Sequence, residues 1–191
     1  MDRQILQISR LVDDLLDVSR ISTGKLLLKR ETVELISVVA TALETVDALF
    51  RVRQHYLTID LPTEQVLVNA DPTRLSQVII NLLNNAAKYT APGGKIALRV
   101  RFDVDQLFIE VTDNGVGLDG EAMQRIFEMF HQVDASLDRE QAGLGVGLTL
   151  ARSLVELHGG SISAESAGAG EGSTFKVQMP IVVEPDGKEQ A

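Results

Sequence analysis

The chain has 191 residues, of which 45% are hydrophobic and 24% are charged, and its formal net charge is −9. This length is enough for one well-packed core with an appendage, and the acidic balance argues against nucleic acid and anionic membranes as partners. The absence of cysteine excludes disulfides, a thiolate nucleophile and a cysteine-based zinc site. No apolar run approaches the roughly 20 residues of a membrane span and no signal peptide opens the chain, so we expect a cytoplasmic location.

The first predicted element is a helix from Asp2 to Ser22, which ends before Gly24. Apolar residues form a stripe along it at helical spacing: Ile5, Ile8, Leu11, Val12, Leu15, Leu16 and Val18. The opposite side carries Asp13, Asp14, Asp17 and Arg20. The stripe needs a cover, which is either the domain that follows or the same helix of a second copy.

The next segment, up to residue 70, combines one helix with extended stretches. The alternation of Leu57, Ile59 and Leu61 indicates a strand with one buried face. We expect an extended chain over Lys25–Leu35, an amphipathic helix over Ile36–Arg51, and strands at His55–Leu61 and Gln65–Val68 around a turn at Pro62-Thr63.

The stretch from Asp71 to Thr90 is the most informative part of the sequence. Asp71 can cap the free amides of a helix, and Pro72 fits the first helical turn. Apolar residues then follow at helical spacing: Leu75, Val78, Ile79, Leu82, Leu83, Ala86 and Ala87. The other face collects Arg74, Gln77, Asn81, Asn84, Asn85 and Lys88.

The asparagines on that face suggest a ligand. Each Asn in a helix interior costs roughly 0.5 kcal/mol relative to Ala, and three occur here within five residues. Asn81, Asn85 and Lys88, at i, i+4 and i+7, can present two amide oxygens and one ammonium to the same object. Such donors suit magnesium and the phosphate that accompanies it. The alternative is an ordinary solvated face.

Beyond the stop at Pro92-Gly93-Gly94, strands and helices alternate. We expect a hairpin of Lys95–Phe102 and Leu107–Val111 around Asp103–Asp105, a short helix over Glu121–Phe130, a helix from the glycines at 143–147 to His158, and strands at Ser161–Glu165 and Thr174–Pro180. The C-terminus of a helix, where His158 lies, favours a cation. Several strands joined as hairpins predict a mixed sheet covered by helices on one face.

Two glycine loops are candidate ligand sites. Asp113-x-Gly115-x-Gly117 follows a strand, and it is either a plain turn or a loop whose carboxylate accepts from a base amine. Glycines at 143, 145 and 147 open a helix, so their bare amides and the helix dipole form a phosphate cradle. Leu148 stands where a dinucleotide fingerprint needs glycine, and no Gly-Lys-Ser/Thr occurs, so a P-loop is excluded.

The polar segment from His131 to Ala142 lies next to the phosphate cradle. It is either a mobile lid, whose Arg139 could reach a terminal phosphate, or an ordinary surface loop.

Taken in order, these pieces resemble the ATP-binding catalytic domain of sensor histidine kinases, in the superfamily of gyrase, heat-shock chaperones, histidine kinases and MutL. The resemblance runs over about Leu26 to Val183 and rests on Asp71-Pro72-x-Arg74-Leu75-x-Gln77-Val78, Asn81-Leu82-Leu83-x-Asn85-Ala86-x-Lys88-Tyr89-Thr90, Asp113-x-Gly115-x-Gly117, Ile126-Phe127-Glu128-x-Phe130, Gly143-x-Gly145-x-Gly147-Leu148 and Gly172-Ser173-Thr174-Phe175. The helix with Leu15-Leu16-Asp17-Val18-Ser19-Arg20-Ile21 resembles the second helix of the kinases' dimerisation hairpin.

The resemblance implies a Bergerat fold, an α+β two-layer sandwich. In this fold a mixed, largely antiparallel sheet is covered on one face by about three helices, and here an N-terminal helix precedes it. The implied domains are residues 1–24 as part of the dimerisation hairpin, without its acceptor helix, residues 25–183 as the ATP-binding domain and residues 184–191 as a polar tail.

The implied cofactors are ATP and Mg²⁺, with Asn85 as metal ligand. Thr174 would support Asp113 through the floor of the adenine pocket, and Phe127 and Phe130 would anchor the lid. The implied catalytic residues are Asn81, Lys88 and Arg139. The implied nucleotide-binding residues are Asn81, Asn85, Lys88, Tyr89, Asp113, Gly115, Gly117, Gly143, Leu144, Gly145, Val146, Gly147, Leu148 and Thr174.

One residue bears on the reaction. Relatives that hydrolyse ATP carry a glutamate where Asn81 stands, and an amide cannot accept a proton at neutral pH. We therefore expect slow hydrolysis and phosphoryl transfer to another nucleophile. The alternatives are a nucleotide-gated interaction module without transfer activity and an ATPase clamp of the gyrase or chaperone type.

The resemblance also implies partners. His55, His131 and His158 all lack the family's acceptor context, so we expect a fragment whose acceptor histidine lies on a missing hairpin segment. The expected partners are that hairpin, a second copy bound through the N-terminal helix, and a receiver domain whose aspartate takes the phosphoryl group. The parent protein could be anchored in a membrane with this domain on its cytoplasmic side.

Overall fold

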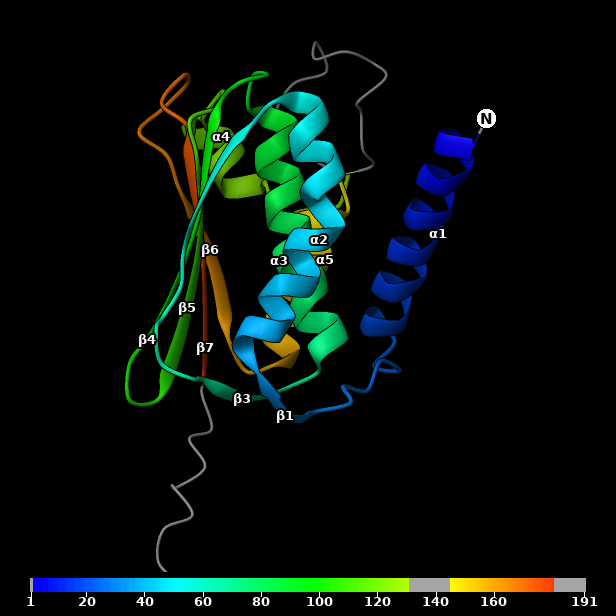
Figure 1. Cartoon of the computed structure of the whole chain (residues 1–191). Coiled ribbons are helices and arrows are strands. Elements are labelled where there is room, and N and C mark those ends of the chain that lie inside the picture. The colour runs from blue at the N-terminus through cyan, green and yellow to red at the C-terminus, as the bar shows by residue number, and fades with distance from the viewer. Residues whose placement is uncertain (1, 131–144, 181–191) are drawn as a thin grey trace, which may run out of the picture.

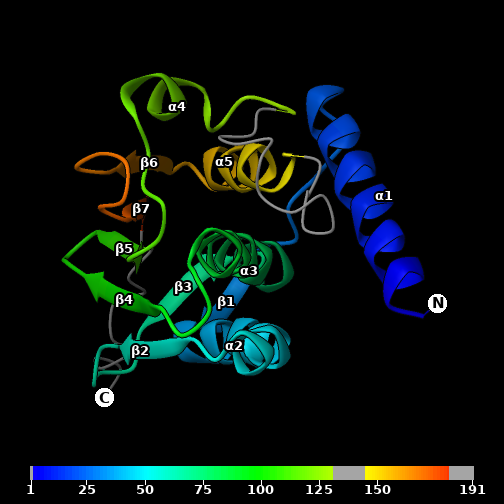
Figure 2. The same cartoon turned by 90° about the horizontal axis from the view of Figure 1, so that it is seen from above.

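The computed structural model describes residues 2–130 and 145–180, with side chains from residue 12 onward. Its elements are α1 Asp2–Ser22, β1 Glu31–Glu34, α2 Leu35–Arg53, β2 Tyr56–Asp60, β3 Leu67–Ala70, α3 Pro72–Tyr89, β4 Lys95–Phe102, β5 Gln106–Asp113, α4 Gly120–Arg125, α5 Gly147–Leu157, β6 Ser161–Glu165 and β7 Ser173–Pro180. Helices α2, α3 and α5 cover one face of the main sheet, and α1 stands beside them (Figures 1 and 2). The expected α+β two-layer sandwich is confirmed.

The main sheet has five strands in the order β2-β4-β5-β7-β6. Strands β4, β5, β7 and β6 pair antiparallel, whereas β2 pairs parallel to β4. The alternation in β4 turns Ile96, Leu98 and Val100 into the core, since each is at most 1% exposed. The predicted hairpin of β4 and β5 is therefore confirmed.

The strands on either side of Pro62-Thr63 do not pair with each other. Strand β3 pairs antiparallel with β1 in a separate two-stranded sheet, while β2 forms an edge of the main sheet. The chain between Asp60 and Leu67 is longer than the tight turns that close hairpins. The helix expected over 121–130 is also shorter, because α4 ends at Arg125 and turns follow it.

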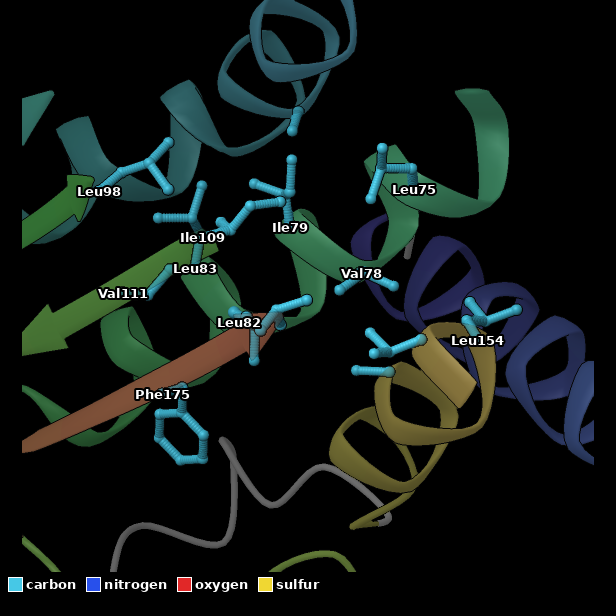
Figure 3. Packing of buried hydrophobic residues seen from close by; sticks show 14 of the residues in the cluster. Leu75, Val78, Ile79, Leu82, Leu83, Leu98, Ile109, Val111, Leu154 and Phe175 are labelled. Carbon is cyan, nitrogen blue, oxygen red and sulfur yellow. The ribbon is translucent and has the colours of Figure 1, made fainter. Parts of the chain in front are cut away.

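Helix α3 is the centre of the core. The Asp71 carboxylate accepts a hydrogen bond from the backbone N–H of Arg74 at 3.1 Å, and Pro72 occupies the first turn, as predicted. The predicted apolar face is fully buried: Leu75, Val78, Ile79, Leu82, Leu83, Ala86 and Ala87 are all 0% exposed. Figure 3 shows the five larger of these side chains, Leu75 to Leu83, in one cluster with Leu98, Ile109, Val111 and Phe175 from the sheet and Leu154 from α5.

The start of α3 is tied to the end of α5 through His158. The backbone N–H of Asp71 donates to His158 Nε2 at 3.1 Å, and His158 Nδ1 donates to the Leu154 carbonyl at 2.8 Å. The imidazole is only 2% exposed, and burial is the main cause that lowers its pKa. The expectation of a cation here is wrong, because removal from water outweighs the attraction of the helix end.

Helix α1 contacts the domain through its acidic side. Asp17 is 8% exposed and accepts from Arg74 Nη1 at 2.5 Å and Nη2 at 3.1 Å and from Gln77 Nε2 at 3.3 Å. Val18 is buried beside it, whereas Val12 and Leu16 stay 49% exposed. Asp17 thus faces inward rather than toward solvent, because α3 supplies a guanidinium for it.

Among the described residues, no helix combines the length and hydropathy required to cross a bilayer.

Candidate functional site

Two segments far apart in the sequence contact the C-terminal half of α3 directly: the loop after β5 and the N-terminus of α5. The segment between β6 and β7 contacts the loop after β5 rather than α3. Val116 N–H donates to the Tyr89 carbonyl at 3.1 Å, and Gly170 N–H donates to the Val116 carbonyl at 2.6 Å. Backbone hydrogen bonds therefore place the loop after β5 between α3 and the 166–172 segment.

The amide face of α3 contacts the start of α5 directly. Asn81 Nδ2 donates to the Gly147 carbonyl at 3.1 Å, which leaves its oxygen as an acceptor. Asn85 lies half-buried one turn further along. Lys88 Nζ donates to the Tyr89 hydroxyl at 3.1 Å and lies 4.7 Å from the centre of that ring. The structure thus gathers the predicted amide oxygens and the ammonium on one half-buried face.

The carboxylate of Asp113 is buried and held at both oxygens. It is 6% exposed, and Oδ1 accepts from the Gly115 N–H at 2.8 Å while Oδ2 accepts from the Ser173 hydroxyl at 2.5 Å. Each carboxylate oxygen has a second lone pair, so Asp113 can still accept from an exocyclic amine of a base. Its orientation is set before any ligand arrives.

The role expected of Thr174 belongs to Ser173. Thr174 Oγ1 lies 3.1 Å from Thr112 Oγ1 on the uncovered face of the sheet, away from the Asp113 carboxylate. Side chains alternate along a strand, so Ser173 shares the covered face with Phe175, Val177 and Met179. That apolar alternation was visible in the sequence and could have identified Ser173.

The glycines of the loop after β5 are required by the protein's own backbone. A Cβ on Gly115 would lie 2.3 Å from the Tyr89 carbonyl oxygen. Gly117 has a φ of +70°, and a Cβ there would lie 2.0 Å from the Gly168 carbonyl oxygen. Close packing of this loop on α3 and on the 166–172 segment therefore explains both glycines, with or without a bound base.

The described part of the predicted phosphate cradle begins at Gly145. Gly145 has a φ of +70°, Val146 is buried, and α5 starts at Gly147, next to Asn81. The free amides of the first turn of α5 thus lie beside the amide face of α3. Arg139, Gly143, Leu144 and the expected lid at 131–142 lie outside the described residues.

Phe127 and Phe130 have different surroundings. Phe127 packs edge-on against Phe175 with 6.4 Å between ring centres, and its carbonyl accepts from the Thr149 hydroxyl of α5 at 2.9 Å. Phe130 is 62% exposed and has a φ of +62°. Phe127 therefore joins the start of the 126–130 turns to α5, while Phe130 contributes nothing to the core.

The sequence and this arrangement agree with one family. The model of the histidine kinase-, DNA gyrase B- and HSP90-like ATPases matches residues 70–183. The chain belongs to this ATPase family. The match begins at the strand before α3 and includes every described segment of the site.

The relatives of this ATPase domain include sensor histidine kinases. It is 39% identical over 179 residues to the circadian input-output histidine kinase CikA of Synechococcus elongatus, covering 92% of this chain and 24% of that protein. It is 34% identical over 179 residues to the adaptive-response sensory kinase SasA of the same organism. That alignment covers 93% of this chain and 46% of SasA. The chain thus spans less than half the length of these relatives.

Solved kinase structures share the fold. Full-length ShkA in complex with AMPPNP gives a TM-score of 0.78 at 25% identity, over 92% of this chain and 36% of that chain. The histidine kinase ThkA in complex with the response regulator protein TrrA gives a TM-score of 0.73 at 22% identity. That superposition covers 95% of this chain and 49% of the ThkA chain. The resemblance to sensor histidine kinase catalytic domains is confirmed.

Proposed function

We propose that this ATPase domain binds Mg·ATP and transfers the γ-phosphoryl group to a histidine on a dimerisation hairpin. The hydrogen bond between Asn81 and Gly147 carries the proposal, since it brings the amide face of α3 against the free amides of α5. One side offers amide oxygens and Lys88, and the other offers the positive end of a helix dipole. A triphosphate with its metal is the ligand that uses both. AMPPNP in the ShkA complex supports this choice.

The remaining residues take the roles that their surroundings allow. The fixed carboxylate of Asp113 accepts from the adenine amine, Gly115 and Gly117 line the base pocket, and Tyr89 stands beside Lys88. Gly145, Val146, Gly147 and Leu148 present backbone to the phosphates, with Gly143 and Leu144 before them. Arg139 is proposed to approach the terminal phosphate.

The donor set fits magnesium. Within residues 2–130 and 145–180 no group of three histidine or acidic side chains is placed to hold a metal ion. Mg²⁺ accepts few protein ligands and keeps water and phosphate oxygens instead. Asn85 would hold it through the amide oxygen, and Asn81 lies one turn away. The bound ion supplies charge neutralisation on the phosphates.

Asn81 favours transfer over hydrolysis. Its amide cannot take a proton from water, and its nitrogen is already engaged by Gly147. ATP therefore persists until a positioned nucleophile arrives. The proposed sequence of partners is the acceptor hairpin, paired in a homodimer through α1, and then the aspartate of a receiver domain. ThkA bound to TrrA supports the last step.

The test combines the chain with a separately expressed acceptor-hairpin protein and γ-labelled ATP. We expect acid-labile, base-stable label on the hairpin histidine, and none with the Asn85→Ala variant. Nucleotide binding without any label would favour an interaction module. Steady phosphate release by the chain alone would favour a gyrase- or chaperone-type clamp and contradict the argument from Asn81.

A further inference from the structure

We define the base loop as residues 113–118. The segment from Ser166 to Gly172 packs against this loop through backbone hydrogen bonds to Gly115 and Val116. The Ser166 hydroxyl accepts from the backbone N–H groups of Leu118 at 3.0 Å and Gly168 at 3.2 Å. It donates to the Gly172 carbonyl at 2.7 Å. A hydroxyl has one donor and two acceptor positions, so this side chain is fully used.

The rest of the segment follows the base loop closely. Gly170 N–H donates to the Val116 carbonyl at 2.6 Å, and Gly172 N–H donates to the Gly115 carbonyl at 3.2 Å. A Cβ on Gly172 would lie 2.0 Å from the Asp113 carbonyl oxygen. The base loop therefore rests on backbone that Ser166 holds in one shape.

We propose that Ser166 is a positioning residue for nucleotide binding, which acts by ordering the base loop and never touches the ligand. The proposal rests on the proposed function, in which Asp113, Gly115 and Gly117 receive the adenine. Without the hydroxyl, Leu118 and Gly168 lose the acceptor for their N–H groups and Gly172 loses a donor. The loop then samples more conformations, and a nucleotide must order it on binding.

Ser166 is half-buried and lies outside the hydrophobic core, so its loss leaves the packing of the domain unchanged. Its effect should therefore be on nucleotide affinity, with little change in the melting temperature. Because the base loop contacts the adenine end, the loss should be the same for a di- and a triphosphate. A defect in the phosphate cradle would instead depend on the number of phosphates.

The experiment measures the Kd of Mg·ADP and Mg·AMPPNP by calorimetry for Ser166→Ala and for Ser163→Ala. Ser163 is an exposed serine of the neighbouring strand β6 and serves as the matched control. We expect Ser166→Ala to weaken both nucleotides about tenfold, Ser163→Ala to match the wild type, and Ser166→Thr to recover most of the affinity. Hydrogen exchange of the Leu118 amide should also become faster in Ser166→Ala.

Two results would overturn the inference alone. One is wild-type affinity in Ser166→Ala with unchanged exchange at Leu118, and the other is a loss for Mg·AMPPNP without a loss for Mg·ADP. Failure of the wild-type chain to bind either nucleotide would overturn the proposed function together with this inference. If Ser166→Ala does not fold, Ser166→Cys replaces it, since a thiol makes only weak hydrogen bonds, and the same outcomes apply.

Discussion

At the scale of single residues, Asn85 decides whether the amide face of α3 is a metal site. It is half-buried and lies on the same face as Asn81, which α5 already engages through Gly147. Truncating its side chain to the methyl group of alanine removes the proposed metal ligand without opening the core, because the core lies on the opposite side of the helix.

Asn85→Ala should therefore abolish or weaken Mg·AMPPNP binding by at least about a hundredfold while the protein stays folded. Calorimetry with and without Mg²⁺ measures the loss, and circular dichroism checks the fold. Asn84→Ala, at the preceding position of the same helix, is the control. Unchanged affinity in Asn85→Ala would show that the metal assignment is wrong.

The neighbours Ser173 and Thr174 make a second comparison at this scale. The Ser173 hydroxyl donates to the Asp113 carboxylate, whereas Thr174 faces the other side of the sheet. A hydrogen bond to a charged group contributes roughly 1.5–3 kcal/mol, so Ser173→Ala should weaken nucleotide binding by about tenfold or more. Thr174→Ala should have little effect. Equal losses in the two variants, measured as Kd of Mg·ADP, would contradict this assignment.

At the scale of elements, the polar face of α3 serves two purposes. Arg74 and Gln77 in its first half bind Asp17 of α1, while Asn81, Asn85 and Lys88 in its second half face the proposed nucleotide. The same periodicity therefore describes an interface for a neighbouring helix and a ligand site. The function of each half of α3 depends on which neighbouring element the fold places against it.

Asp17→Asn should loosen α1 from the domain. Arg74 would lose its charged partner in a site where Asp17 is 8% exposed, and such a loss costs about 2 kcal/mol or more. Hydrogen exchange of the amides in residues 14–22 should become roughly tenfold faster or more, while exchange in α3 stays unchanged. Asp13→Asn, on the exposed side of α1, is the control. Unaltered exchange in Asp17→Asn would mean that other contacts hold α1.

At the scale of the whole molecule, His158 joins the start of α3 to the end of α5 while neutral. Its pKa in the folded protein lies below the ordinary value of 6.5, chiefly because of burial. The unfolded chain therefore binds a proton more readily than the folded chain as the pH falls below about 6.5. Above that pH both states hold neutral imidazole, and the effect disappears.

Urea unfolding at pH 7.5 and pH 5.5 measures this dependence. We expect the free energy of unfolding to fall toward pH 5.5 by up to about 1.4 kcal/mol per pH unit from this group. His158→Gln should show a smaller dependence, although it is less stable at pH 7.5. An identical pH dependence in the variant would assign the effect to other groups.

Much of the fold was predictable because its signals are local. The cap at Asp71, the helical spacing of Leu75 to Ala87 and the alternation in β4 each depend on residues within a turn or a strand. The candidate site was predictable for the same reason, since Asn81, Asn85 and Lys88 share one helix. The glycine loops carried their own signal as breaks next to a strand and a helix.

Contacts between distant residues were not predictable in this way. The sequence by itself determined the four long helices, the hairpin, the amide face and the membership of the ATPase family, because periodicity, capping and motif spacing act along the chain. Only the tertiary structure decided that β2 pairs parallel to β4, that Asp17 binds Arg74, that His158 is neutral and that Ser173 rather than Thr174 holds Asp113. Each of these features depends on which groups packing brings together and on how much water packing excludes. Neither can be predicted from residues that are neighbours in the sequence.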